Sequence, residues 1–171
     1  MGKYFASGKN GLEKDLTQSE RWYKRAISSG SLDAMYQLGK AYQSSIIEIE
    51  NPDEESFLLF KKAAMRNHTI SYIALGDCYS DKNNTHYNPI ESARWFGKIA
   101  ALYEDMTDNG VHFFVTECGA GYRTFLDFDM EHKKLFASAI KKLASQYERG
   151  EGVNKDADEA NKWIALASRL S

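Results

Sequence analysis

The sequence predicts an all-α fold built from about four to five stacked helical hairpins, and three observations support this. A Leu-Gly-x-x-Tyr motif at Leu38 recurs at Leu75, and aromatic pairs recur at a similar interval along the chain. A period of this length is typical of stacked repeats rather than of a conventional globular core. The stretch 139–167 reads as two helices around a glycine-containing turn, and 171 residues hold four to five such units.

The first part of the chain predicts three helical segments. Residues 1–7 resemble the end of a helix, and Asp15 is the expected cap of a helix that runs to about Ser29. The next helix is expected over Leu32–Ser44. Gly39 lies inside it, where the lack of a side chain allows the paired helix to approach closely, at a helix-propensity cost of about 1 kcal/mol.

Two Asn-Pro pairs predict where the following hairpins restart. In both, asparagine is the expected cap and proline the first helical residue, as at Asn51 and Pro52 and again at Asn88 and Pro89. The asparagines occupy the same place in the repeat as Asp15. The caps therefore support the repeat register independently of the aromatic residues.

The repeat is lost after Ala101 and returns near the C-terminus. We expect one degenerate helical hairpin within 102–136, in which 111–122 is a helix that carries a distorted form of the Leu-Gly-x-x-Tyr motif. A helix is expected from about 130 to 149. A turn with Gly150 and Gly152 follows it, because glycine adopts positive φ at little cost.

These residues resemble the Sel-one-like repeats, relatives of the tetratricopeptide repeats. The resemblance covers 1–101 and 137–171 and is poor over 102–136. The matching residues are Ala34, Leu38, Gly39 and Tyr42; Gly150, Gly152, Val153 and Asp156; and Ala160 and Trp163. It implies a right-handed, tetratricopeptide-like α-solenoid that serves as a protein-interaction platform. We expect a single domain over 1–171, with regular repeats at 1–101, a degenerate repeat at 102–136 and a C-terminal repeat at 137–171.

Charge and hydropathy exclude several classes of partner. The chain has 22 Lys and Arg residues against 24 Asp and Glu residues, so no binding of nucleic acid or of an anionic membrane surface is expected. No run is long and apolar enough to insert in a membrane, and residues 1–20 lack the apolar core of a signal peptide. As written, the chain predicts a cytoplasmic protein. A periplasmic or secreted location is expected if a leader has been removed, since the repeat phase places Met1 inside a helix.

No catalytic residue, cofactor site or metal site is expected. The histidines are scattered over the chain without an i,i+4 pair or an acidic partner at ligand spacing; they are His68, His86, His112 and His132. Cys118 with His112 or His132 could act as a nucleophile and base, but a buried cysteine in place of the motif leucine explains the position as well. A hydrolase, of the kind claimed for cysteine-rich relatives, is therefore the alternative function.

The favoured function is a non-enzymatic adaptor or scaffold that binds another protein on its concave face, and one use would be a bacterial immunity or regulatory protein. Residues two positions from Leu38 lie about 200° around the helix and face away from the packing side. The expected binding stripes are Asp33, Tyr36, Lys40 and Gln43; Ile70, Ile73, Asp77 and Ser80; and Ser138, Lys141, Ser145 and Glu148. We expect Tyr36, Ile70 and Ile73 to be exposed and to form the centre of this surface.

Overall fold

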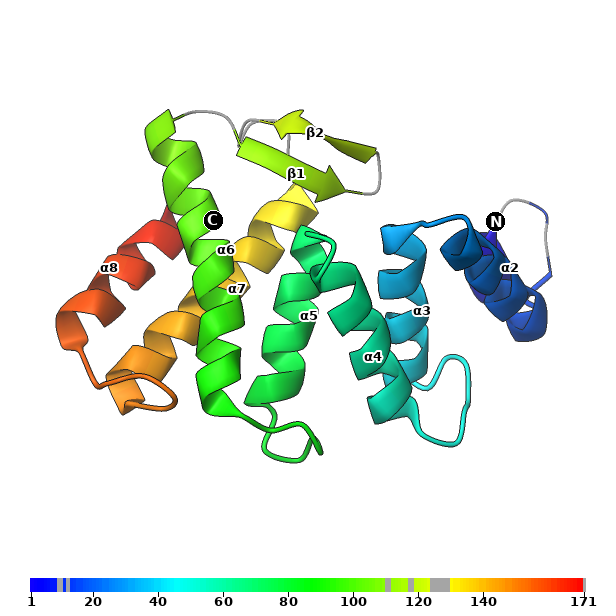
Figure 1. Ribbon diagram of the computed structural model, residues 1–171, viewed down its shortest axis with the longest axis horizontal. Coiled ribbons are helices and arrows are strands. Elements are labelled where there is room, and N and C mark those ends of the chain that lie inside the picture. Colours follow the sequence, from blue (N-terminus) through cyan, green and yellow to red (C-terminus); the bar gives the residue numbers. More distant parts are fainter. Residues whose placement is uncertain (9–10, 12, 110–111, 117–118, 124–129, 171) are drawn as a thin grey trace. The chain divides into compact units, whose positions relative to one another are not determined.

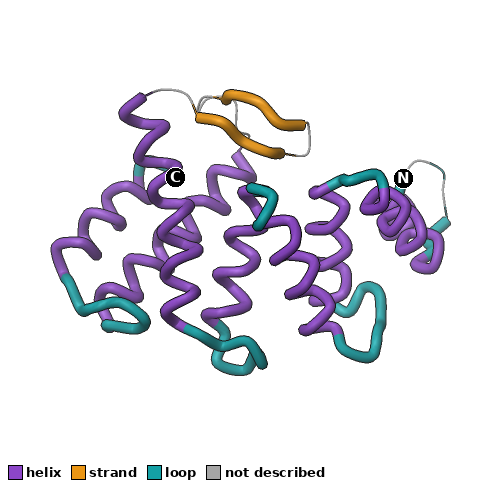
Figure 2. The backbone as a smooth tube through the Cα atoms, viewed as in Figure 1, coloured by secondary structure: helices purple, strands orange, loops and turns teal. Residues whose placement is uncertain are grey.

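A computed structural model describes residues 1–8, 11, 13–109, 112–116, 119–123 and 130–170 of the chain (Figures 1 and 2). The chain divides into two compact units, 1–71 and 72–171, and each is described by itself. Helices make up most of both units.

The first unit contains helices α1 (Gly2–Ser7), α2 (Leu16–Ser28), α3 (Leu32–Gln43) and α4 (Pro52–Ala64). These boundaries confirm the expected helices. The Asp15 carboxylate accepts a hydrogen bond from the Gln18 amide at 2.9 Å, as a capping residue should. Pro52 is the first residue of α4, but the Asn51 side chain makes no capping hydrogen bond there.

A glycine packed against an aromatic ring joins the paired helices of the first unit. A Cβ atom added to Gly39 on α3 would lie 2.6 Å from Cε1 of Phe60 on α4. Gly2 on α1 meets Tyr23 on α2 in the same way, at 2.9 Å. The Ser19 hydroxyl also donates to the Gly2 carbonyl at 2.9 Å, in a buried position. The glycine of the repeat is therefore required by close helix contact.

The second unit repeats this arrangement with helices α5 (Thr69–Ser80), which begins just before the unit boundary, and α6 (Pro89–Asn109). A Cβ atom at Gly76 would overlap the ring of Phe96. The Ser92 hydroxyl donates to the Gly76 carbonyl at 3.0 Å. Asn88 caps α6 as expected, because its side-chain oxygen accepts from the amides of residues 90 and 91 at 3.2 Å.

Helices α7 (Met130–Arg149) and α8 (Ala157–Ser168) form the last hairpin. Gly150 and Gly152 have φ angles of 69° and 78°, so the predicted positive-φ turn is confirmed. A Cβ atom at Gly152 would also overlap the Pro89 carbonyl at the start of α6. Asp156 accepts from the amides of residues 158 and 159 at 2.9 and 3.0 Å and caps α8.

The prediction for 102–136 is wrong in its middle part. Helix α6 continues to Asn109, and strands β1 (His112–Thr116) and β2 (Gly119–Arg123) then pair in an antiparallel sheet, with Phe114 opposite Gly121 (Figure 2). Two paired strands therefore occupy the described residues of the segment 111–122, where a helix was expected. The sequence HFFVT is rich in aromatic and β-branched residues, which favour a strand.

Candidate functional site

The predicted stripe on α3 is only partly open to solvent. Lys40 is exposed, whereas Asp33, Tyr36 and Gln43 are half-buried. The Tyr36 ring packs against Phe60, with ring centroids 5.9 Å apart. Lys40 donates to the Gln43 side chain at 3.0 Å, so these two polar groups already bind each other.

The predicted exposure of the α5 stripe is wrong at its two apolar residues. Ile70 is 4% exposed and Ile73 is 6% exposed, so neither can be the centre of an open contact surface. Asp77 and Ser80, further along the helix, are half-buried. Apolar residues lie on every side of α5, a pattern typical of a buried helix, and its residues 69–76 are all buried.

Helix α7 presents its predicted stripe to solvent. Ser138, Lys141 and Glu148 are exposed and Ser145 is half-buried, while the opposite side of α7 is buried. Lys134 and Lys142 are also exposed and lie close to this stripe at helical spacing. One face of α7 therefore combines several basic side chains with two hydroxyl groups.

Two adjoining hollows run along this face of α7. The first, which we call the lysine hollow, has a volume of about 590 Å³. Its lining among the described residues is Lys134, Ala137, Ser138, Lys141, Lys142 and Ser145. The second, the Gln146 hollow, has a volume of about 300 Å³. It shares Lys142 and Ser145 with the first, so the two hollows adjoin at these residues.

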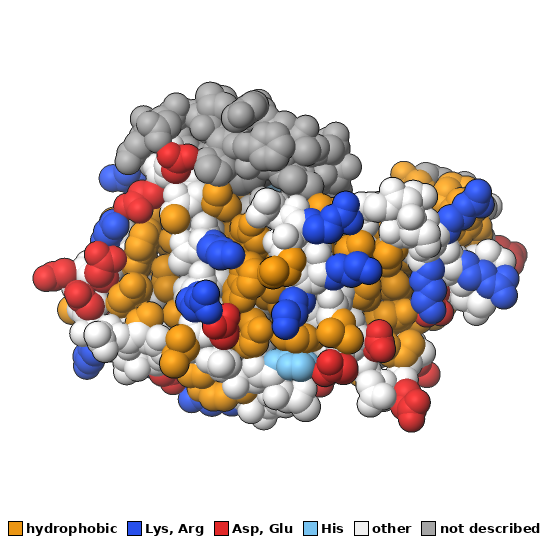
Figure 3. All heavy atoms as spheres, viewed as in Figure 1, with side chains coloured by type: hydrophobic (Ala, Val, Ile, Leu, Met, Phe, Trp, Pro, Cys, Tyr) orange, Lys and Arg blue, Asp and Glu red, His pale blue; other side chains and the backbone are white. Residues whose placement is uncertain are grey.

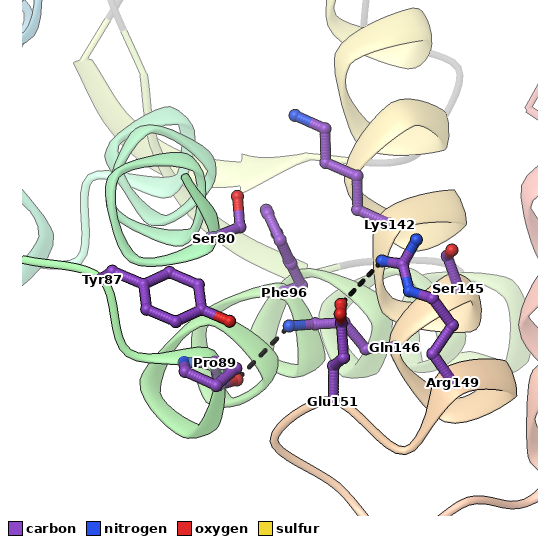
Figure 4. Close-up of a pocket in the computed structure, with 9 residues that line it drawn as sticks. All are labelled: Ser80, Tyr87, Pro89, Phe96, Lys142, Ser145, Gln146, Arg149 and Glu151. Atoms are coloured by element: carbon purple, nitrogen blue, oxygen red, sulfur yellow. Dashed lines mark hydrogen bonds and ion pairs between the residues drawn. The ribbon is translucent and has the colours of Figure 1, made fainter. Parts of the chain in front are cut away.

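The Gln146 hollow brings residues of α7 opposite residues that follow or end α5 (Figure 4). Its lining consists of Ser80, Tyr87, Pro89 and Phe96 together with Lys142, Ser145, Gln146, Arg149 and Glu151. The predicted residues Ser80 and Ser145 thus line one hollow. Gln146, Arg149, Tyr87 and Phe96 were not predicted from the sequence.

Several charged side chains around the Gln146 hollow form ion pairs with each other or with neighbouring residues. Lys142 binds Asp77 of α5 at 2.5 Å, and Arg149 binds Glu151 at 3.0 Å. Lys82 also donates to Glu151, at 3.2 Å. The Lys82 ammonium and then the Arg149 guanidinium hold the pKa of the Glu151 carboxyl below its ordinary value. Lys142 and Arg149 are therefore already engaged in ion pairs within the protein.

Three groups along the two hollows lack such partners. Within the described ranges, neither Lys134 nor Lys141 has an acidic side chain in ion-pair distance. Gln146 is 4% exposed and donates from Nε2 to the Pro89 carbonyl at 3.3 Å. Its Oε1 atom is buried and finds no donor in the described part of the chain. Buried polar atoms are rarely left in this state.

A second basic surface lies on α6, where Lys and Arg side chains lie among hydrophobic ones on the face shown in Figure 3. Here the ammonium of Lys98 lies 4.1 Å from the centre of the Trp95 ring and 5.3 Å from that of Tyr72. Lys98 itself thus supplies the cation for these rings. Arg94 is paired with Glu91 at 2.5 Å. The basic groups of α6 are therefore already engaged.

The alternatives from catalysis and metal binding gain no support from the described residues. Cys118 lies outside them and the side chain of His112 is not described, so their pairing stays a hypothesis. Cys78 is 1% exposed. No cluster of His, Cys, Asp and Glu able to hold a metal occurs in the described ranges. None of the helices seen in those ranges has the length and apolar character to cross a membrane.

A simple pattern in the sequence would have found the residues missed on α7. Lys134, Ser138, Lys141 and Ser145 are spaced by four, three and four residues, which places them on one helix face. The predicted stripe includes Ser138, Lys141 and Ser145 and does not include Lys134. Gln146 and the residues from α6 become neighbours only through tertiary packing.

Comparison with known proteins identifies the repeats. The profile described as Sel1 repeat matches residues 1–31, 32–68 and 137–171. A Sel1 repeat protein from Oxalobacter formigenes is similar in structure, with a TM-score of 0.53 and 22% identity over 99% of this chain and 71% of that one. A protective antigen of uropathogenic Escherichia coli with an SLR fold gives a TM-score of 0.51 and 19% identity, over 98% of this chain and 36% of that one. No curated protein matches the chain. These neighbours confirm the predicted helical-repeat fold.

Proposed function

The chain belongs to the Sel1 repeat family, whose repeats generally serve as protein-interaction modules, and we propose that it binds a segment of a partner protein along the exposed face of α7. The single observation that carries this proposal is the pair of adjoining hollows on α7, which share Lys142 and Ser145. The opposite side of this helix is buried, and its exposed face borders two hollows. Such a face gives a partner segment a concave surface to bind.

Polar residues of α5 belong to the same proposed surface. Ser80 lines the Gln146 hollow, and Asp77 holds the Lys142 ammonium beside it. The buried residues Ile70 and Ile73 are excluded from the surface. The proposal therefore moves the centre of binding from apolar residues of α5 to basic and hydroxyl residues of α7.

The stripe on α3 is a further part of the proposal with fewer supporting observations. Lys40 is exposed there, and Tyr36 is half-buried against Phe60. Binding on a concave face stays a proposal that rests on the resemblance to tetratricopeptide arrays. A bacterial immunity or regulatory role is one use of such binding, and the identity of a captured partner tests it.

Affinity capture from the source organism tests the proposal when it is made with matched variants. Ser138→Tyr adds bulk to the lysine hollow without touching the core, because Ser138 is exposed. Ser168→Tyr adds the same bulk to an exposed position near the end of α8. We expect a protein that is retained by the parent chain and by Ser168→Tyr and is lost with Ser138→Tyr.

Two outcomes contradict the proposal in different ways. Equal capture by all three proteins places the binding surface elsewhere. A parent chain that retains no protein beyond the background of a bait-free column contradicts the interaction function itself.

A further inference from the structure

We infer that the segment bound on α7 is acidic and extended, with two carboxylates placed three residues apart for Lys134 and Lys141. This inference rests on the proposed function and names the chemistry of its partner. It follows from two lysines that have no ion-pair partner among the described residues, from their spacing, and from a buried acceptor further along α7.

Among the described residues, the charged side chains that line the lysine hollow are all lysines. Lys142, Lys82 and Lys162 each have a carboxylate within 3.2 Å. Lys134 and Lys141 have none among the described residues, although both line the lysine hollow. Charge complementarity therefore favours carboxylates as the groups that enter this hollow.

The spacing of the two lysines fits an extended segment. Seven residues separate Lys134 from Lys141, which corresponds to about 10 Å along a helix. In a polyproline-type chain, with three residues per turn and about 3.1 Å per residue, side chains three residues apart project to the same side about 9 Å apart. Asp or Glu residues at i and i+3 of such a segment therefore match the spacing of the two lysines along the helix.

The Gln146 hollow supplies the complementary contact for the backbone of the segment. Gln146 lies five residues beyond Lys141, about 7 Å along α7. Its buried Oε1 lacks a donor in the described part of the chain. A polyproline-type backbone keeps its N–H groups free of internal hydrogen bonds, so one of them can donate to this oxygen.

A nucleic acid fits these observations less well than an acidic protein segment does. A continuous row of phosphates would meet the exposed Glu148 and the carboxylates of Asp77 and Glu151 next to the lysines. The whole chain has a formal net charge of −2, which does not favour a polyanion. Two carboxylates at fixed spacing can avoid these repulsive contacts.

Fluorescence anisotropy with labelled synthetic peptides tests the inference on the full chain. The probe is a short peptide with an Asp-x-x-Asp core in a Pro- and Ala-containing background. The comparison peptides carry Asn-x-x-Asn, or the same composition with the two Asp residues adjacent. We expect the first peptide to bind, the Asn peptide to show no saturable binding, and the permuted peptide to bind at least about threefold more weakly.

Two charge-reversal variants locate the contact. Lys134→Glu/Lys141→Glu should weaken binding of the Asp-x-x-Asp peptide by about tenfold or more. Lys62→Glu/Lys155→Glu changes the net charge equally at exposed positions outside the two hollows, and should change binding by less than about twofold. All four side chains are exposed, so we expect both variants to have the same melting temperature as the parent chain.

The results separate this inference from the proposed function. The acidic-segment inference would be overturned if both variants weakened binding equally or if the permuted peptide bound equally well. Equal competition by a single-stranded oligonucleotide, or a parent chain that binds no peptide, would also overturn it. If Ser138→Tyr loses the captured partner while Lys134→Glu/Lys141→Glu retains it fully, the binding surface stands and the acidic segment is wrong. If Ser138→Tyr has no effect on capture, the surface itself is wrong.

Discussion

Helices α5 and α7 occupy the same place in the repeat, yet α5 buries the stripe that α7 exposes. Ile73 of α5 corresponds to Lys141 of α7, and Ile70 corresponds to Ser138. The two isoleucines are buried, whereas Lys141 and Ser138 are exposed. The repeat thus specifies which residues pack within a hairpin, and it leaves the opposite face of each helix free to become core or surface.

The packing side of the two helices differs as well. Gly76 of α5 lies against Phe96, and its carbonyl accepts from Ser92. In the last hairpin the corresponding residues are Ala144, Ile164 and Ala160; the two alanines are buried, whereas Ile164 is 40% exposed. The glycine contact and its serine hydrogen bond are therefore absent from this hairpin. We expect α5 to tolerate substitution less than α7 does.

The largest effect is expected at the glycine contact. Gly76→Leu should destabilise the protein by about 3 kcal/mol or more, because the new side chain must displace the Phe96 ring from a packed interior. Thermal denaturation should show a decrease in Tm of about 6–12 °C for a chain of this length.

Gly97→Ala on α6 is the matched control. No atom within 4 Å would meet an added Cβ there, so alanine should raise stability by up to about 1 kcal/mol through helix propensity. If Gly76→Leu melts within about 2 °C of the parent chain, the assigned helix contact is wrong.

A smaller effect is expected where the two stripes differ most. Ile73→Ala should cost about 2–3 kcal/mol because it leaves a cavity in the interior. Lys141→Ala, at the corresponding position of α7, should change the free energy of unfolding by less than about 0.5 kcal/mol, since the side chain is exposed. Urea denaturation of both variants measures the difference. Equal costs would contradict the contrast between α5 and α7.

The sequence predicted the parts of the fold that depend on short-range rules. The caps at Asp15, Asn88 and Asp156 and the glycine turn after α7 follow from residues within a few positions of each other. The two paired strands were not predicted, because the repeat pattern indicated a helical hairpin within 102–136, although the segment contains a strand-forming run. In this segment the repeat pattern predicted a helix, whereas the local sequence favoured a strand.

The candidate site was predicted in part for a similar reason. Helical spacing identified Ser138, Lys141 and Ser145, and the structure places all three beside the hollows of α7. The exposure of Ile70 and Ile73 was predicted from their position opposite Leu75, but tertiary packing decides whether such a face is covered. The apolar residues on all sides of α5 were the signal that this face is covered.

Acid should affect the start of α5 more than the corresponding part of α7. His68 is fully buried and its Nδ1 lies 2.7 Å from the Ser71 hydroxyl. Burial lowers the pKa of His68 from 6.5 to about 4. In α7 the corresponding residue is Phe136, which does not titrate.

The direction of the pH effect follows from this lowered pKa. Above pH 6.5 the neutral imidazole makes its full contribution to the free energy of unfolding. This contribution is lost as the pH falls from about 6.5 to about 4, because in that range only the unfolded state binds the proton. The loss should reach about 2 kcal/mol at pH 5. His68→Phe should reduce this pH dependence, as measured by urea denaturation between pH 8 and pH 5. An unchanged dependence in the variant would show that His68 is protonated in the folded protein.

Chemical labelling of lysines tests the central claim, that the exposed face of α7 is the binding surface. The protein is labelled with an amine-reactive reagent with and without its captured partner, and each lysine is quantified by mass spectrometry. We expect the partner to protect Lys134 and Lys141 and to leave the exposed Lys62 and Lys155 as reactive as before. Unchanged reactivity of Lys134 and Lys141 at saturating partner would contradict the claim.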